Sequence, residues 1–112
     1  SAGGLISLYL GWELNNVFTK AACLSPGIIK GNDNYFQQLI KVNQPKKLQL
    51  AIVNGTSGLD LELQFGVDKL IAYLNEINFP KKNLLYWVDE KGSHSPRSWS
   101  HQAKDILLWM YK

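Results

Sequence analysis

Three short apolar segments alternate with four segments of helical character, and this alternation constrains the fold most. Each apolar segment ends at turn-forming residues such as Pro26-Gly27, and the helical segments repeat their apolar residues at helical spacing. Such an order predicts a parallel sheet with helices packed on its faces. We therefore predict an α/β fold with three parallel strands and about four helices. The expected strands cover residues 17–26, 48–58 and 83–90, and the expected helices cover residues 3–14, 35–42, 67–77 and 99–111.

The first of these helices is apolar on almost every side. Only Ser7, Gly11 and Glu13 interrupt it. A helix of this kind is expected to be buried on most sides. The third helix instead carries one apolar stripe, and we expect Ser98 to be the N-cap of the last helix.

Length and composition restrict the partners of the chain. At 112 residues it forms one domain at most, and 46% apolar with 19% charged residues favours a folded body. The net charge of +3 comes from scattered lysines, so we expect no nucleic-acid partner. No apolar run reaches the roughly 18 residues that span a bilayer, so we expect no membrane partner. The cellular location stays open.

Three polar residues fall where the predicted strands end or a helix begins. Ser1 precedes the first helix, Asp60 lies in the expected loop after the second strand, and His94 lies in the loop after the third. The carboxyl ends of parallel strands meet at one edge of the sheet, where functional groups gather. A serine hydroxyl needs a base, and an imidazole base needs a carboxylate to orient it. The order serine, acid, histidine is that of the α/β-hydrolase nucleophile-elbow enzymes.

Several stretches carry a resemblance to a known family. "SAGG" before an apolar helix resembles the second half of the nucleophile elbow G-x-S-x-G. "FTKAACLSPGI", "NGTSGLDLELQFGVDKLIAYL" and "GSHSPRSW" look like later landmarks of the esterase family that includes esterase-D-like, enterochelin-esterase-like and feruloyl-esterase-like enzymes. The resemblance covers nearly all 112 residues, but only the half of that fold that follows the elbow.

The resemblance implies a role for each candidate residue. Ser1 would be the nucleophile, Asp60 the acid and His94 the general base, and the amide of Ala2 would supply one oxyanion-hole donor. The small residues at Ala2 and Gly3 would be required because larger side chains collide with a tight strand-to-helix turn. Trp99, five residues after His94, is expected to border the substrate pocket.

The resemblance also leaves the acid open and makes the chain incomplete. Asp60 lies further from Gly55 than the family's acid lies from the corresponding glycine, so Glu62 and Asp89 are alternatives. The strand leading into the elbow and the loop with the second oxyanion donor are absent. We therefore expect residues 1–112 to be a single partial domain, the C-terminal half of an α/β-hydrolase. Its first strand would have an unpaired edge, and its partner would be the N-terminal half or another copy.

These features favour a serine hydrolase that acts on small-molecule carboxylic esters through an acyl-enzyme. Such a mechanism needs no metal and no organic cofactor. One alternative is an acyltransferase of the mycolyltransferase type. Another is a non-catalytic fragment or binding module, since losing one oxyanion donor costs about a hundred- to thousandfold in rate. An N-terminal nucleophile using its own amine is disfavoured, because an apolar helix follows Ser1.

Plainer structural roles exist for the same residues. His94 is also explained as a solvated turn residue, and Asp60 as the N-cap of the next helix. Cys23, the only cysteine, is best explained as a small buried apolar residue, which leaves no internal disulfide and no cysteine-based zinc site. His101 is expected to be exposed. The tryptophans are expected in the core, at positions 12, 87, 99 and 109.

Overall fold

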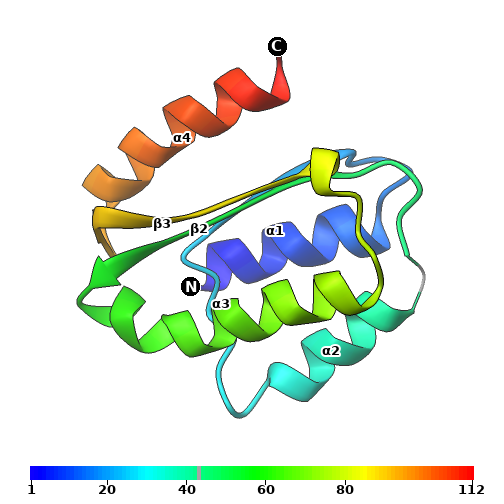
Figure 1. Ribbon diagram of the computed structural model, residues 1–112, viewed down its shortest axis with the longest axis horizontal. Helices are drawn as coiled ribbons and strands as arrows, with labels where there is room; N and C mark the ends of the chain where they lie inside the picture. Colours follow the sequence, from blue (N-terminus) through cyan, green and yellow to red (C-terminus); the bar gives the residue numbers. More distant parts are fainter. Residues whose placement is uncertain (43) are drawn as a thin grey trace.

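The computed structural model describes residues 1–42 and 44–112 and confirms the predicted fold class. A three-stranded parallel sheet, in the order β1-β2-β3, lies between α4 on one face and α1, α2 and α3 on the other (Figure 1). The elements in chain order are α1 Ala2–Glu13, β1 Lys20–Leu24, α2 Asp33–Lys41, β2 Gln49–Ser57, α3 Leu59–Glu76, a 3-10 turn Lys81–Asn83, β3 Leu84–Ser93 and α4 Pro96–Met110. No helix in the described ranges combines the length and hydropathy needed to cross a bilayer.

The central strand β2 organises the core. Its residues Leu50 to Val53 are fully buried, as expected for a strand covered on both faces. Ile52 lies between Cys23 of β1 and Tyr86 of β3. Side chains alternate across the sheet, so one set joins the large core with α1 and α3, and the other joins the smaller core under α4.

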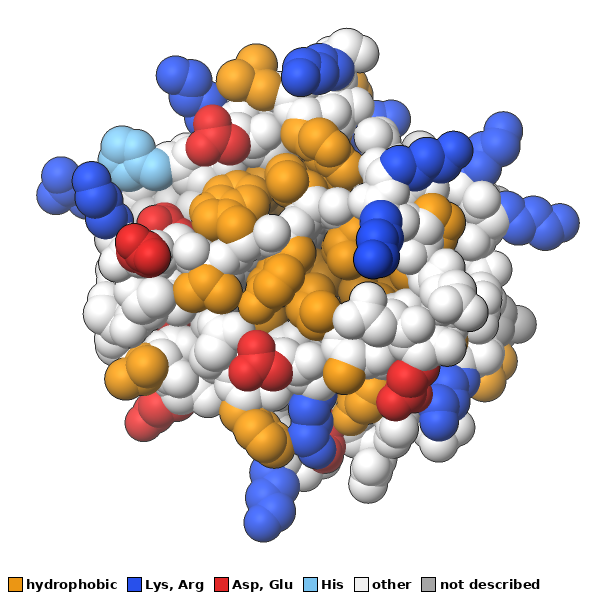
Figure 2. Space-filling model, viewed as in Figure 1, with side chains coloured by type: hydrophobic (Ala, Val, Ile, Leu, Met, Phe, Trp, Pro, Cys, Tyr) orange, Lys and Arg blue, Asp and Glu red, His pale blue; other side chains and the backbone are white. Residues whose placement is uncertain are grey.

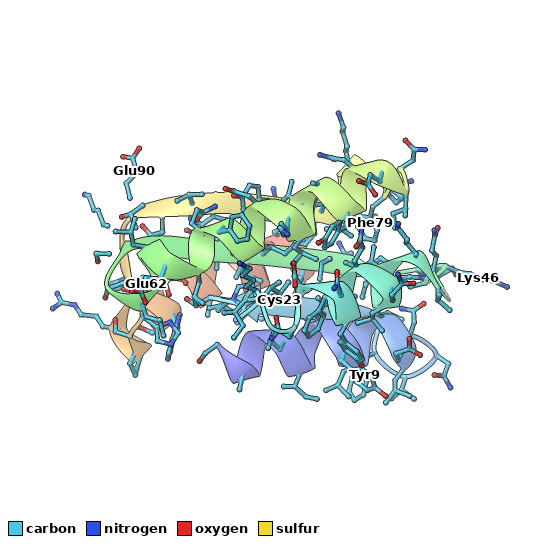
Figure 3. All side chains as sticks on the ribbon, turned by 90° about the horizontal axis from the view of Figure 1, so that it is seen from below. Tyr9, Cys23, Lys46, Glu62, Phe79 and Glu90 are labelled. Carbon is cyan, nitrogen blue, oxygen red and sulfur yellow. The ribbon has the colours of Figure 1, made fainter. Side chains whose placement is uncertain are left out.

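Helix α1 departs from the prediction that it is buried on most sides. Only one stripe is buried, which includes Leu8 and Trp12, whereas Ile6 is 53% and Tyr9 is 36% exposed. Figure 3 shows Tyr9 on the outer side of the helix, away from the sheet. The reason is that the described elements pack against one side of α1 only, mainly β1. An apolar face of this helix therefore remains at the surface.

Several element boundaries also differ from the predictions. Ser98 is not the N-cap of α4, because Ser95 takes that position and its hydroxyl accepts the Ser98 backbone N–H. Pro96, which lacks the N–H that a first helical residue leaves unused, starts the helix. Asp60 is not in a loop and is not an N-cap: α3 begins at Leu59 after Gly58, so Asp60 lies in its first turn.

Two glycines allow helices to approach the end of β1 and the segment that follows it closely. A Cβ atom on Gly66 of α3 would lie 1.8 Å from the carbonyl oxygen of Ile28, and one on Gly4 of α1 would lie 2.8 Å from that of Leu24. At Gly3, a Cβ atom would meet nothing within 4 Å. The resemblance implies that a larger side chain would collide at Gly3, but the structure has open space there. A larger side chain would collide at Gly4 instead.

The glycine contacts predict a contrast between two identical substitutions. Gly66→Ala should lower the free energy of unfolding by about 3 kcal/mol, because the added methyl overlaps the backbone of the facing segment. Gly3→Ala should raise it by about 0.5 kcal/mol, because alanine favours a helix where space is open. Urea unfolding followed by circular dichroism measures both, and equal effects would contradict the packing described here.

Candidate active site

Asp60 and His94 meet at the carboxyl edge of the sheet. Asp60 comes from the first turn of α3, and His94 from the connection between β3 and α4. The Oδ1 atom of Asp60 lies 2.7 Å from Nδ1 of His94. Asp60 is fully buried, whereas the His94 side chain is 18% exposed. In Figure 3, Glu62 and Glu90 mark this end of the molecule, and Lys46 and Phe79 mark the opposite end.

The second carboxylate oxygen of Asp60 is held by two further donors. The backbone N–H of Gly55 lies 2.6 Å from Oδ2, and the hydroxyl of Ser25 lies 2.8 Å from it. An ionised carboxylate only accepts hydrogen bonds, so the His94 nitrogen that faces Oδ1 carries a proton. The neutral imidazole then has its lone pair on Nε2. The arrangement therefore presents a base at Nε2.

Position 55 leaves no room for a side chain. A Cβ atom there would lie 2.5 Å from the carbonyl oxygen of Gly92 and 2.8 Å from Oδ2 of Asp60. Only a residue without a side chain lets the end of β2 approach both groups. Sequence reasoning missed Gly55 as a site residue, because it interpreted "NGT" as a turn, whereas the structure has these residues at the end of β2.

Ser25 also belongs to the site and was missed as a functional residue. It follows β1 and is fully buried, with φ of 49°, in the left-handed region that side chains disfavour. Its hydroxyl accepts the indole N–H of Trp99 at 2.9 Å. The turn signal at Pro26-Gly27 marks this corner in the sequence, but nothing in that signal predicts the backbone angle or the buried hydroxyl.

Ser1 lies at the same edge of the sheet, beside Ser25. Its backbone nitrogen donates to the carbonyl oxygen of Ser25, and its own carbonyl accepts the N–H of Gly27 at 3.2 Å. Burial lowers the pKa of the Ser1 amine, although attraction to Asp60 opposes that effect. The Ser1 hydroxyl makes no capping bond to α1. The hydrogen bonds of the described residues include none between Ser1 and His94.

Trp99 packs against His94 and also lines a cavity together with Ser1. The Trp99 ring stands edge-on to the His94 ring, with 5.0 Å between ring centroids. Trp99 and Ser1 also line a cavity of about 400 Å³ between the start of α1 and β1. Ala2, the other candidate, is the first residue of α1, so its amide has no carbonyl four residues earlier to bind.

The alternative acids lie elsewhere. Glu62 is exposed on α3, and Asp89 accepts the side-chain amide of Gln102 and the backbone N–H of Lys91, both at 3.0 Å. His101 is exposed on α4. Cys23 is buried, and burial raises the pKa of its thiol to about 12, which disfavours the thiolate form at neutral pH. In residues 1–42 and 44–112, no group of three His, Cys, Asp or Glu side chains is arranged to hold a metal ion.

Comparisons of the chain with protein-family models, with curated proteins and with solved structures gave no match.

The bonds of Asp60 predict a stability effect that does not depend on any activity. Asp60→Ala leaves the buried Gly55 N–H and Ser25 hydroxyl without their acceptor, and should lower the free energy of unfolding by about 3 kcal/mol. Glu62→Ala, an exposed carboxylate in the same helix, should change it by less than about 0.5 kcal/mol. Chemical unfolding of the two variants checks this, and similar losses in both would contradict the network.

Proposed function

We propose that this chain carries the catalytic residues of a serine hydrolase that cleaves carboxylic esters through an acyl-enzyme. The observation that carries the proposal is the buried Asp60 carboxylate bonded to His94 at the edge of the sheet where Ser1 precedes α1. The "SAGG", "FTKAACLSPGI" and "GSHSPRSW" stretches add the resemblance to the C-terminal half of the esterase family within the α/β-hydrolase fold.

In the proposed reaction, His94 takes and returns one proton in each of the two half-reactions. Nε2 of His94 takes the proton of the Ser1 hydroxyl as its oxygen attacks the ester carbonyl. The Ala2 amide donates to the oxygen that becomes negative. His94 then gives its proton to the departing alcohol, which breaks the ester bond and leaves an acyl group on Ser1. Water then attacks the acyl carbonyl while His94 takes its proton. The bond to the Ser1 oxygen breaks, His94 returns the proton to that oxygen, and the carboxylic acid leaves.

A binding module is the second candidate, and one observation favours it. The hydrogen bonds of the described residues join His94 to Asp60 but do not join Ser1 to His94. A degenerate or incomplete site would keep the Asp60 to His94 contact as a structural bond. An ester turnover rate for the chain separates the two candidates. An acyltransferase differs only in the acceptor, and product analysis with a sugar present would identify it.

We also propose that a further polypeptide segment covers the free edge of β1. The peptide groups of Thr19 and Ser25 form hydrogen bonds with β2. Successive residues of a strand direct their peptide groups to opposite sides. Ala22 and Leu24 therefore direct theirs away from β2. Ala22 and Leu24 also line the cavity beside Ser1 and Trp99. Figure 2 shows apolar side chains in the middle of one face, between α4 and α1, with both basic and acidic side chains around them. The segment would come from an N-terminal half or from a second copy.

Covalent labelling and one substitution test the hydrolase. A fluorophosphonate probe should attach to Ser1, and His94→Ala should lower kcat/KM for a p-nitrophenyl ester by at least about 100-fold, because the proton acceptor is lost. His101→Ala, which removes the exposed histidine of α4, should leave the rate unchanged. Mass spectrometry locates the label. An unlabelled Ser1, or full activity in His94→Ala, would rule the mechanism out.

The free edge predicts association of the isolated chain. Unpaired strand edges template pairing with another chain, so the wild-type chain should form oligomers in sedimentation velocity. Ala22→Lys should shift it toward monomer, because a charge on an edge strand opposes pairing. Asn75→Lys, at an exposed position near the end of α3, should not. A monodisperse wild-type monomer with a sharp two-state melt would contradict the proposal.

A further inference from the structure

Trp99 contacts His94 directly and is linked to Asp60 through Ser25. Its ring packs edge-on against His94, with an interplanar angle of 82°. Its indole nitrogen lies 2.9 Å from the Ser25 hydroxyl, which in turn lies 2.8 Å from Oδ2 of Asp60. One side chain in the first turn of α4 thus reaches the imidazole directly and the carboxylate through one intervening residue.

The direction of these hydrogen bonds follows from the donors available. An indole nitrogen can only donate, so the Ser25 oxygen accepts from Trp99. A hydroxyl has a single proton, and the Ser25 proton is therefore free to be donated to Asp60. The order Trp99 to Ser25 to Asp60 has one consistent arrangement, in which each donor has one acceptor.

The backbone of Ser25 indicates that its hydroxyl is needed. At φ of 49° a glycine is the residue of lowest strain, because it has no Cβ atom. Serine at this angle, fully buried, is disfavoured by its backbone. What serine adds over glycine here is the hydroxyl that joins Trp99 to Asp60.

We propose that Ser25 and Trp99 are positioning residues for the Asp60 and His94 pair. The Ser25 hydroxyl and the Gly55 amide together hold Oδ2, which leaves Oδ1 facing Nδ1 of His94. The Trp99 ring limits the tilt of the imidazole. The pair then keeps the proton on Nδ1 and the lone pair on Nε2. The effect of these residues on rate rests on the proposed hydrolase, but their effect on the histidine tautomer does not.

The test uses the whole chain and a readout that is independent of turnover. Long-range ¹H–¹⁵N correlation spectra of neutral His94 report which ring nitrogen holds the proton. The wild-type chain should show the Nδ1–H tautomer. Ser25→Gly and Trp99→Phe should each shift His94 toward a mixture of the two tautomers. Trp109→Phe, which changes the same residue type in the same helix, should leave the spectrum unchanged.

Ester hydrolysis supplies the second readout. Each single variant should lower kcat by about 10- to 100-fold, as expected for a misplaced catalytic group. KM should stay unchanged in Ser25→Gly, because Ser25 is not among the residues that line the cavity beside Ser1. The double variant should lose no more than the worse single variant, because phenylalanine keeps an aromatic ring at position 99 and both substitutions remove the same Trp99 to Ser25 hydrogen bond. Ser25→Gly relieves the backbone angle, so the variant should keep its melting temperature, and a loss of signal through unfolding is recognised directly.

The possible results separate this inference from the proposed function. An Nδ1–H tautomer that survives in Ser25→Gly and Trp99→Phe, or is missing in the wild type, overturns the positioning role. Losses in kcat that multiply in the double variant overturn the shared hydrogen bond. If the tautomer shifts as expected while the wild-type chain hydrolyses no ester, the positioning role stands and the hydrolase proposal fails.

Discussion

The buried carboxylate of Asp60 is the interaction on which the arrangement of this edge depends. A carboxylate removed from water is costly unless donors replace the lost hydration. Here the donors come from the end of β1 at Ser25, from β2 at Gly55, and from the connection after β3 at His94. One side chain of α3 therefore ties together the carboxyl ends of all three strands. Three segments of the chain thus share Asp60 as their hydrogen-bond acceptor.

The fold was predictable from the sequence because burial imposes the pattern that periodicity detects. The run through Leu50 to Val53 is apolar without alternation, and it became the central strand. Prediction was wrong where a boundary depends on one hydrogen bond, as at Ser95, which caps α4 in place of Ser98. It was also wrong for α1, because hydrophobicity alone does not show how many neighbours a helix has within the chain.

The site likewise contains some residues that the sequence predicts and others that it does not. Asp60 and His94 were candidates because parallel topology brings strand ends to one edge, which needs no atomic detail. The parts played by Ser25 and Gly55 depend on a backbone angle of 49° and on an approach that leaves no room for a Cβ atom. Trp99 was expected to border the substrate pocket. It lines the cavity beside Ser1, and substrate binding there stays a prediction. Its hydrogen bond joins residues 74 positions apart, and no local pattern encodes such a pairing.

Within the described residues β2 is the one strand that pairs with β1, and Ser25 connects β1 with the Asp60 and His94 pair. Its carbonyl accepts the backbone nitrogen of Ser1, while its hydroxyl bonds to Asp60. Gly4 brings the first turn of α1 against Leu24, so the position of Ser1 depends on how firmly β1 is held. A strand with only one neighbour frays more easily than one paired on both sides. A segment pairing with β1 would therefore restrict Ser1 and Ser25 together, and through Ser25 the orientation of Asp60 toward His94.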